Sequence, residues 1–195
     1  PGREYPGKHP RTCHYLRTFT QMRLCGNYLP GPASAGESPR HDLFCDCEET
    51  NMIRKANIKD LPVLTELALE LWHEHAADKM YYDLGRIMTS GESIFFLAYE
   101  EEKAVGFAQC QLRHDYVEGT ETSPVGYLEG IYVKEASRKH GFASRLMKAC
   151  EDWARAEGCM EFASDCEIDN TESLEFHLKL GFKEANRIIC FAKNL

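Results

Sequence analysis

The sequence predicts an α/β (α+β) domain in which helices cover both faces of a mixed sheet. Three observations support this. Apolar runs of strand length alternate with amphipathic helical segments after residue 50. Two of these runs are joined by a polar turn, Glu100-Glu101-Glu102-Lys103, which predicts an antiparallel hairpin. A third run, 125–133, is followed by a helical segment and a fourth run, which predicts a right-handed crossover between parallel strands.

The predicted elements follow the order β-α-α-β-β-β-α-β-α-β. Asp60 is expected to cap the first helix, where Pro62 is tolerated in the first turn, and apolar residues recur at helical spacing through about His75. Gly158 and Gly181 are expected to end the last two helices. The remaining helices are predicted at about 78–89, 142–157 and 171–180, and the strands at 51–55, 93–99, 104–112, 125–133, 160–166 and 187–193.

Residues 1–50 differ from the rest of the chain in composition. Residues 1–51 hold six of the eight prolines and five of the fourteen glycines, without periodic apolar positions. We therefore expect a poorly ordered extension at 1–50 and one domain at 51–195. One hypothesis is that Met52, which opens the patterned part, is the natural start. The extension lacks the features of a secretory signal, so a cytoplasmic location is expected.

The acidic charge lies entirely in the predicted domain. The chain has 23 Lys and Arg against 31 Asp and Glu, a formal net charge of −8, and residues 1–51 contribute six of each sign. An acidic body repels nucleic-acid phosphates and favours cationic ligands. No apolar run approaches the length of roughly 18 residues that crosses a membrane, so neither nucleic acid nor membrane is an expected partner.

The nine cysteines lack paired CxxC spacing. Cys45 and Cys47 with His41 are compatible with a metal site or with a reduced tail, and the tail is the favoured interpretation. The later cysteines are expected to be small core residues in a reducing compartment.

A basic turn joins the predicted strand 125–133 to the helix that follows. It has the pattern R-x-x-G-x-A, with Arg138, Gly141 and Ala143. The N–H groups at a helix start favour a phosphate, Gly141 permits close approach of the backbone, and Arg138 and Lys139 add charge. The alternative is a solvated turn. The pattern is neither the GxxxxGK[ST] nor the GxGxxG nucleotide loop.

Further motifs surround this turn. They are Leu128-Glu129-Gly130-Ile131-Tyr132-Val133, Glu161-Phe162-Ala163-Ser164-Asp165, Asn170 and His177-Leu178-Lys179-Leu180-Gly181-Phe182. Together with the turn they resemble the GCN5-related N-acetyltransferase (GNAT) superfamily over most of residues 52–195. The resemblance implies a mostly antiparallel sheet with one splayed parallel pair, and acetyl-coenzyme A as cosubstrate. The implied coenzyme contacts are Asn170 at the thiol end, Ile131, Tyr132 and Val133 along the pantetheine arm, and Arg138, Lys139, His140, Gly141, Phe142, Ala143 and Ser144 at the phosphates.

A narrower resemblance covers residues 114–133 and 161–165, which are similar to segments of bacterial aminoglycoside 6′-N-acetyltransferases; Leu71-Trp72 fits the same pattern. It implies acetyl transfer to the 6′-amino group of an aminoglycoside by direct attack in a ternary complex, and hence antibiotic resistance. Two alternatives remain open. One is acetylation of another cationic amine, such as a polyamine or a protein N-terminus, and the other is a non-catalytic acyl-coenzyme A sensor.

Acetyl transfer needs a neutral amine, a positioned thioester and a stabilised oxyanion. The backbone near Tyr132 or Val133, where the parallel pair opens, is the candidate oxyanion donor. By resemblance, Glu129 is the candidate base, acting directly or through water, and Asp165 the anchor for an ammonium group. Glu129 is expected within the strand 125–133 and Asp165 near the carboxyl end of its parallel neighbour, so both can face one cleft. The alternative for each is a purely structural role.

Other candidates carry two interpretations each. Tyr116 and Trp72 stack on sugar rings or belong to the core. His177 stands where many members of the superfamily have a tyrosine, and either protonates the departing thiolate or only packs. Asp115, Glu118 and Glu121 form an acidic rim or a solvated loop. No metal is expected, because His73, His75 and His114 lack a complete ligand pattern. A homodimer is expected, with 187–193 pairing across the edge.

Overall fold

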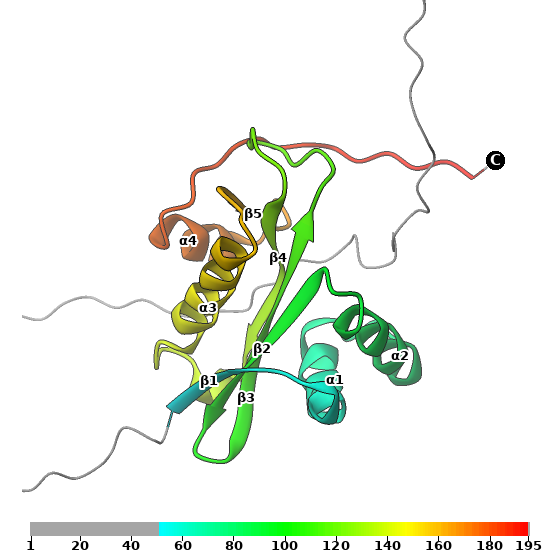
Figure 1. Ribbon diagram of the computed structural model, residues 1–195, viewed down its shortest axis with the longest axis vertical. Coiled ribbons are helices and arrows are strands. Elements are labelled where there is room, and N and C mark those ends of the chain that lie inside the picture. Colours follow the sequence, from blue (N-terminus) through cyan, green and yellow to red (C-terminus); the bar gives the residue numbers. More distant parts are fainter. Residues whose placement is uncertain (1–50, 195) are drawn as a thin grey trace, which may run out of the picture.

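The computed structural model describes residues 51–194 (Figure 1). The expected extension at 1–50, with His41, Cys45 and Cys47, lies outside the described residues. No helix within 51–194 is both long and apolar enough to cross a bilayer. The elements are β1 (Asn51–Lys55), α1 (Leu61–Leu71), α2 (Ala77–Met88), β2 (Ser93–Glu100), β3 (Lys103–Arg113), β4 (Val125–Val133), α3 (Phe142–Ala156), β5 (Phe162–Ser164) and α4 (Thr171–Lys179).

The strands form one mixed sheet in the order β1-β2-β3-β4-β5. Strands β1 to β4 pair with their neighbours antiparallel, and β4 and β5 pair parallel with α3 as the connection between them. The predicted hairpin and the predicted parallel crossover are both confirmed. The parallel pair is short, with three residue pairs from Gly126 and Phe162 to Leu128 and Ser164.

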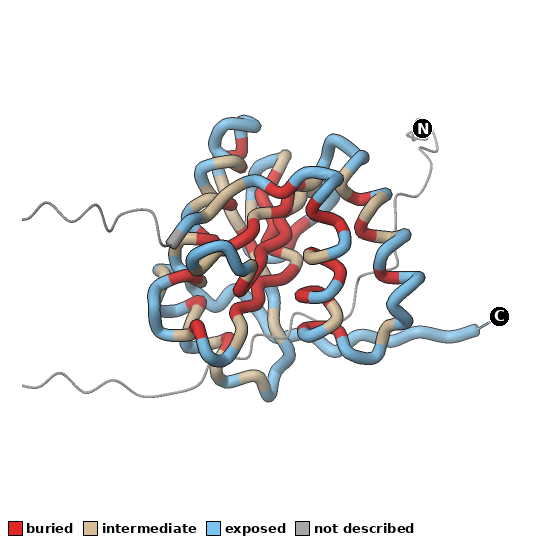
Figure 2. The backbone as a smooth tube through the Cα atoms, turned by 90° about the horizontal axis from the view of Figure 1, so that it is seen from below, coloured by how far each residue is buried: buried red, intermediate tan, exposed pale blue. Residues whose placement is uncertain are grey.

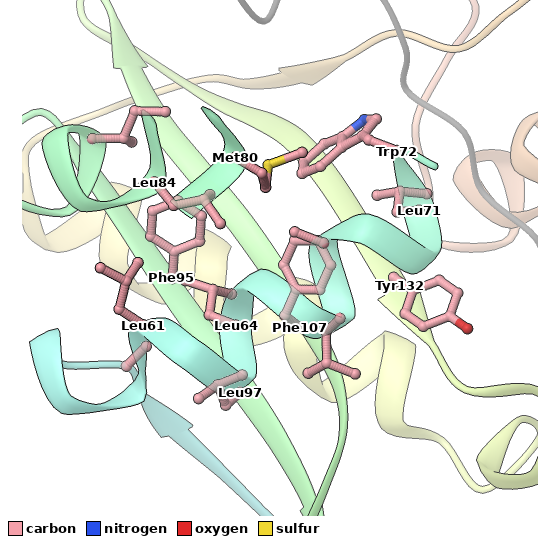
Figure 3. Close-up of a cluster of buried hydrophobic side chains, with 14 residues drawn as sticks. Leu61, Leu64, Leu71, Trp72, Met80, Leu84, Phe95, Leu97, Phe107 and Tyr132 are labelled. Atoms are coloured by element: carbon pink, nitrogen blue, oxygen red, sulfur yellow. The ribbon is translucent and has the colours of Figure 1, made fainter. Parts of the chain in front are cut away.

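Two apolar clusters lie on opposite faces of the sheet, as alternation along the strands requires. Phe95, Leu97 and Phe107 face α1 and α2, whereas Ile94 and Ala98 belong to the cluster that contains α3 (Figure 3). The buried backbone therefore runs through the middle of the molecule between the helical layers (Figure 2). This arrangement confirms the predicted helices on both faces.

The start of α1 differs from the expectation, because the Asp60 side chain does not cap that helix. Asp60 instead accepts two hydrogen bonds from Arg54, at 2.6 and 2.8 Å, and one from the Asn57 N–H at 2.8 Å. The Arg54 guanidinium lowers the pKa of the Asp60 carboxyl group. Asp60 thus ties β1 to the turn before α1. The helix ends at Leu71, before His75.

The strand expected at 187–193 is absent from the sheet of residues 51–194. The segment passes the β3–β4 loop and then leaves the body of the molecule (Figure 1), and Ile188, Ile189 and Phe191 are 68%, 81% and 91% exposed. The alternation of apolar residues in this segment is typical of a strand. A strand also needs a neighbouring strand to which its backbone can hydrogen-bond. The expectation was therefore wrong for the single chain.

Candidate active site

The sheet opens between β4 and β5. Their pairing stops at Leu128 and Ser164, where the Ser164 hydroxyl donates to the Leu128 carbonyl at 3.2 Å. Strand β4 continues to Val133, whereas β5 has ended. The second half of β4 therefore has an edge that no strand of residues 51–194 covers.

The backbone of β4 directs N–H groups toward this open edge. The Lys134 N–H bonds the Val105 carbonyl at 2.7 Å, and antiparallel ladders alternate, so the N–H groups of Ile131 and Val133 point away from β3. The Val133 carbonyl, on the same side, accepts a 3.0 Å bond from Arg138 Nε. By the same alternation the Tyr132 N–H faces β3. Its side chain packs in the core beside α1, and its hydroxyl donates to Glu70 at 2.6 Å. The open edge offers main-chain donors of the kind that a pantetheine arm or an oxyanion needs.

The turn before α3 is shaped to receive an anion. Lys139 and Gly141 have φ angles of 66° and 77°, in the left-handed region. A Cβ atom on Gly141 would meet no described atom within 4 Å, so the glycine serves the backbone conformation and leaves open space in front of the helix. The first intrahelical bond of this turn runs from the Arg145 N–H to the Gly141 carbonyl. The N–H groups at 142–144 therefore have no intrahelical acceptor.

Side chains around the turn divide into anchors and exposed groups. Phe142 is buried in the α3 core and fixes the helix start. Lys139, His140 and Ser144 are exposed beside the free N–H groups, and Ala143 is half-buried. Glu100, at the end of β2, braces the turn by accepting a 2.7 Å bond from the Ser137 hydroxyl and lying 3.4 Å from His140 Nδ1. These features fit a pyrophosphate at the helix start.

Glu129 lies at a β-bulge in β4. Gln109 pairs with Gly130 and the next β3 residue, Cys110, pairs with Leu128, which leaves Glu129 as the extra residue. A bulge interrupts the regular ladder and re-aims the side chain of the extra residue. Glu129 is thereby placed just where the β4–β5 pairing has ended.

Arg113 holds the Glu129 carboxylate. Arg113 Nε and Nη2 donate to Glu129 Oε1 at 3.0 and 2.8 Å. The Arg113 guanidinium carbon also lies 3.2 Å above the centroid of the Tyr127 ring. The Arg113 and Glu129 side chains are 25% and 13% exposed, so this ion pair is largely removed from water.

Asp165 follows the end of β5 and is exposed. Burial raises the pKa of Tyr127, and the nearby Asp165 carboxylate raises it further, so the phenol stays protonated beside this carboxylate. Tyr127 thus contacts Arg113 with its ring and approaches Asp165 with its hydroxyl. The structure brings the two predicted carboxylates into one polar group: Glu129, Arg113, Tyr127 and Asp165.

His177 is buried as a neutral imidazole. Nδ1 lies 2.7 Å from the Ser173 carbonyl, which requires a proton on that nitrogen, and Nε2 has no hydrogen-bond partner within the described chain. Burial lowers the pKa of His177. The ring packs edge-on against Phe176 and Phe182. This environment disfavours the imidazolium proposed as proton donor and agrees with the packing alternative.

The remaining predicted residues lie in different surroundings. Trp72 is 6% exposed and packs on Phe107 and Gly130 (Figure 3). This position agrees with the alternative that Trp72 is a core residue. Tyr116 is exposed on the β3–β4 loop, with its hydroxyl donating to Glu118 at 2.9 Å. Asn170 caps α4 by accepting from the Ser173 N–H at 3.0 Å. Among residues 51–194, no group of three or more potential ligands is placed to hold a metal.

Sequence reasoning missed Arg113, Tyr127 and the bulge. Arg113 ends β3 opposite Val125, and its side chain reaches Glu129 across Tyr127. The available signal was that Arg113 ends one predicted strand and Glu129 lies in the next strand of the sheet. The cross-strand register needed to use it depends on the bulge, which leaves no local pattern in the sequence.

An opened parallel pair beside a helix N-terminus is the arrangement expected of a coenzyme A-dependent acetyltransferase. The model of the acetyltransferase (GNAT) family matches residues 61–182, and the chain belongs to this family. Among curated relatives, the aminoglycoside N(6')-acetyltransferase type 1 of Acinetobacter haemolyticus is 37% identical over 143 residues, which cover 73% of this chain and 98% of the relative. The enzyme of the same name from Serratia marcescens is 39% identical over 130 residues, 66% of this chain and 89% of that one.

Solved structures agree with the sequence relatives. The enzyme AAC(6')-Iy in complex with the bisubstrate analogue CoA-S-monomethyl-acetylneamine is 37% identical and matches with a TM-score of 0.72, over 74% of this chain and 99% of that one. The apo structure of AAC(6')-Ig from Acinetobacter haemolyticus is 36% identical, with a TM-score of 0.70 over 74% and 99% of the two chains.

Proposed function

We propose that this protein transfers the acetyl group of acetyl-coenzyme A to the 6′-amino group of aminoglycosides and thereby confers resistance to them. The open edge of β4, which lies between the anion-binding turn of α3 and the Glu129–Asp165 group, is the observation that carries the proposal. The names of the relatives and the bisubstrate complex of AAC(6')-Iy support the same reaction.

The coenzyme fits the residues present. The N–H groups at 142–144, which lack an intrahelical acceptor, would hold the pyrophosphate together with Arg138, Lys139 and His140. The N–H groups of Ile131 and Val133 would bind along the open edge. Asn170, at the start of α4, would flank the thiol end. Acetyl-coenzyme A supplies the thioester, and the protein supplies orientation and main-chain donors.

The carboxylates act on the amine. Asp165 binds an ammonium group of the substrate, and Glu129 takes the proton from the reacting 6′-ammonium, directly or through one water. The neutral nitrogen attacks the thioester carbonyl. The C–N bond forms, the C–S bond breaks, and the coenzyme departs as a thiolate. The acylated nitrogen loses its second proton, and the thiolate takes this proton up directly or through water. Tyr116 and the loop carboxylates Asp115, Glu118 and Glu121 are exposed on the loop that follows Arg113 and would contact the sugar rings and their ammonium groups.

We further propose that residues 51–195 form the acetyltransferase domain of a cytoplasmic homodimer, with no nucleic-acid or membrane partner. The exposed apolar residues Ile188, Ile189 and Phe191 support the dimer. An apolar segment of this kind can add as a strand to an outer edge of the sheet in a second copy, such as that of β5. Light scattering should give the mass of two chains. A chain truncated after Asn186 should give the mass of one, and a monomeric full-length chain would contradict the dimer.

Thiol release from acetyl-coenzyme A tests the function directly. Kanamycin should support turnover, and its 6′-hydroxyl analogue should not, because it lacks the reacting amine. The product mass should show one added acetyl group. Turnover with spermidine alone would identify a different amine as the substrate, and binding of the coenzyme without turnover on any amine would contradict an enzymatic role.

A further inference from the structure

We propose that Arg113 is the positioning residue for Glu129, and that it orients this carboxylate for proton transfer at the expense of affinity for the cationic substrate. The inference rests on the proposed function, because it assigns a partner to the base of that reaction. Arg113 itself is not expected to touch the reacting atoms.

The contacts of Arg113 leave it little freedom. Its guanidinium stacks on the Tyr127 ring at 3.2 Å, which restricts the plane of the group. Its Nε and Nη2 converge on a single oxygen, Oε1 of Glu129. Tyr127 and Glu129 belong to the same strand, so the arginine spans β4 from Tyr127 to the bulge. A carboxylate held by two charge-assisted bonds in a largely desolvated pair has a defined direction.

The charge of Arg113 is unexpected in a site for polycationic substrates. Glu129 and Asp165 attract ammonium groups, whereas a guanidinium fixed on Glu129 repels these groups. Arg113 therefore weakens the attraction that the carboxylates provide. Orientation is the compensating benefit, because Glu129 stands at a bulge where the regular ladder does not fix its backbone.

This role predicts opposite changes in turnover and in affinity. In Arg113→Met, kcat with kanamycin should fall by about 100-fold, the cost of a misplaced catalytic group. The affinity for kanamycin, measured by calorimetry with coenzyme A present, should stay the same or increase, because a repelling charge is gone. Arg155→Met is the matched control, since Arg155 is exposed on α3 and pairs only with Glu151 and Asp152 among the described residues. It should keep the wild-type kcat.

Arg113→Lys separates orientation from charge. Lysine retains the positive charge but cannot stack in a plane or donate from two fixed nitrogens to one oxygen. Its kcat should lie well below that of wild type while the affinity for kanamycin is unchanged. This variant also keeps the test decisive if Arg113→Met fails to fold.

Two results would overturn the inference. One is a folded Arg113→Met with wild-type kcat. The other is a parallel loss of kcat, affinity and melting temperature, which indicates a structural role only. Failure of the proposed function is distinguishable, because the wild-type protein would then not acetylate kanamycin at all.

Discussion

Glu129 and Asp165 have the same chemical group but different surroundings. Glu129 is largely buried and held by Arg113, whereas Asp165 is exposed at the end of β5. A proton acceptor must keep a defined position relative to one amine, and an anchor must accommodate ammonium groups at varied positions. These surroundings favour Glu129 as the base and Asp165 as the anchor.

Replacing Glu129 with glutamine tests the first assignment. Glu129→Gln keeps the shape of the side chain but cannot take up the proton, so kcat with kanamycin should fall by about 100-fold or more. Steady-state kinetics of thiol release would measure it. Glu151→Gln, on the outer part of α3, is the control and should behave as wild type. An unchanged kcat in Glu129→Gln would rule out this residue as the base.

His177 should make stability depend on pH. Its folded-state pKa is lowered by burial, so the unfolded chain takes up a proton at a higher pH than the folded one. The stability that the neutral ring contributes is present above about pH 6.5 and is lost as the pH falls through the folded pKa.

Denaturant unfolding at a series of pH values, from 7.5 to below the ordinary histidine pKa of about 6.5, would measure this loss. The free energy of unfolding should decrease less in His177→Gln than in wild type. A His177→Gln slope equal to that of wild type would contradict the buried neutral ring.

At the scale of elements, Gly130 sets how closely α1 approaches β4. A Cβ atom on Gly130 would lie 2.7 Å from Trp72 Cζ2 and 3.3 Å from a methyl group of Leu71. The φ angle of Gly130 is not positive, so the constraint is one of space. The Trp72 ring therefore rests directly on the strand residue that follows Glu129.

Gly130→Ala should destabilise the protein by about 1–3 kcal/mol through overpacking. Trp72→Phe removes the ring atoms that would clash. The double variant Gly130→Ala/Trp72→Phe should therefore cost less than the sum of the two single changes. Chemical denaturation of all four proteins measures the coupling. Strictly additive changes would show that Trp72 does not limit this contact.

The helices and the first five strands are predictable because their signals are local. The periodicity of apolar residues and the glycines at 158 and 181 lie within each element, and the structure places the elements close to the expected bounds. The strand expected at 187–193 has the same local signal but lacks a partner in the sheet. Pairing is a property of distant residues, and the segment alone does not contain it.

The candidate site divides in the same way. The turn at 138–144 is predictable because its glycine and its helix start are adjacent in the sequence. The position of Glu129 beside the opening also follows from the order of strands. Its pairing with Arg113 does not, because the bulge at Glu129 shifts the register with β3 by one residue.

For the whole molecule, β1 is held to the rest of the described fold at two points. Its residues pair with β2 from Asn51 onward, and Arg54 holds Asp60 at the start of α1. The net charge of −8 also belongs to residues 52–195. We therefore propose that the fold and the electrostatic attraction of the substrate reside in the same part of the chain.

Removal of residues 1–50 should leave the melting temperature and kcat unchanged. Removal of residues 1–56 should lower the melting temperature, because it deletes β1 and leaves the Asp60 carboxylate without Arg54. Thermal denaturation followed by circular dichroism, together with thiol-release kinetics, measures both effects. A loss of activity on removing 1–50 alone would show that the extension takes part in function.

The opening between β4 and β5 has a consequence for how this enzyme can change over generations. It exists because strand pairing stops at Ser164, and it presents peptide groups, which every amino acid carries. Under the proposed function the β3–β4 loop would contact the antibiotic, so substitutions there would alter that surface without altering these peptide groups. With that contact, drug preference would drift by point mutation while use of the acetyl donor is inherited intact, which would favour a broadening resistance spectrum.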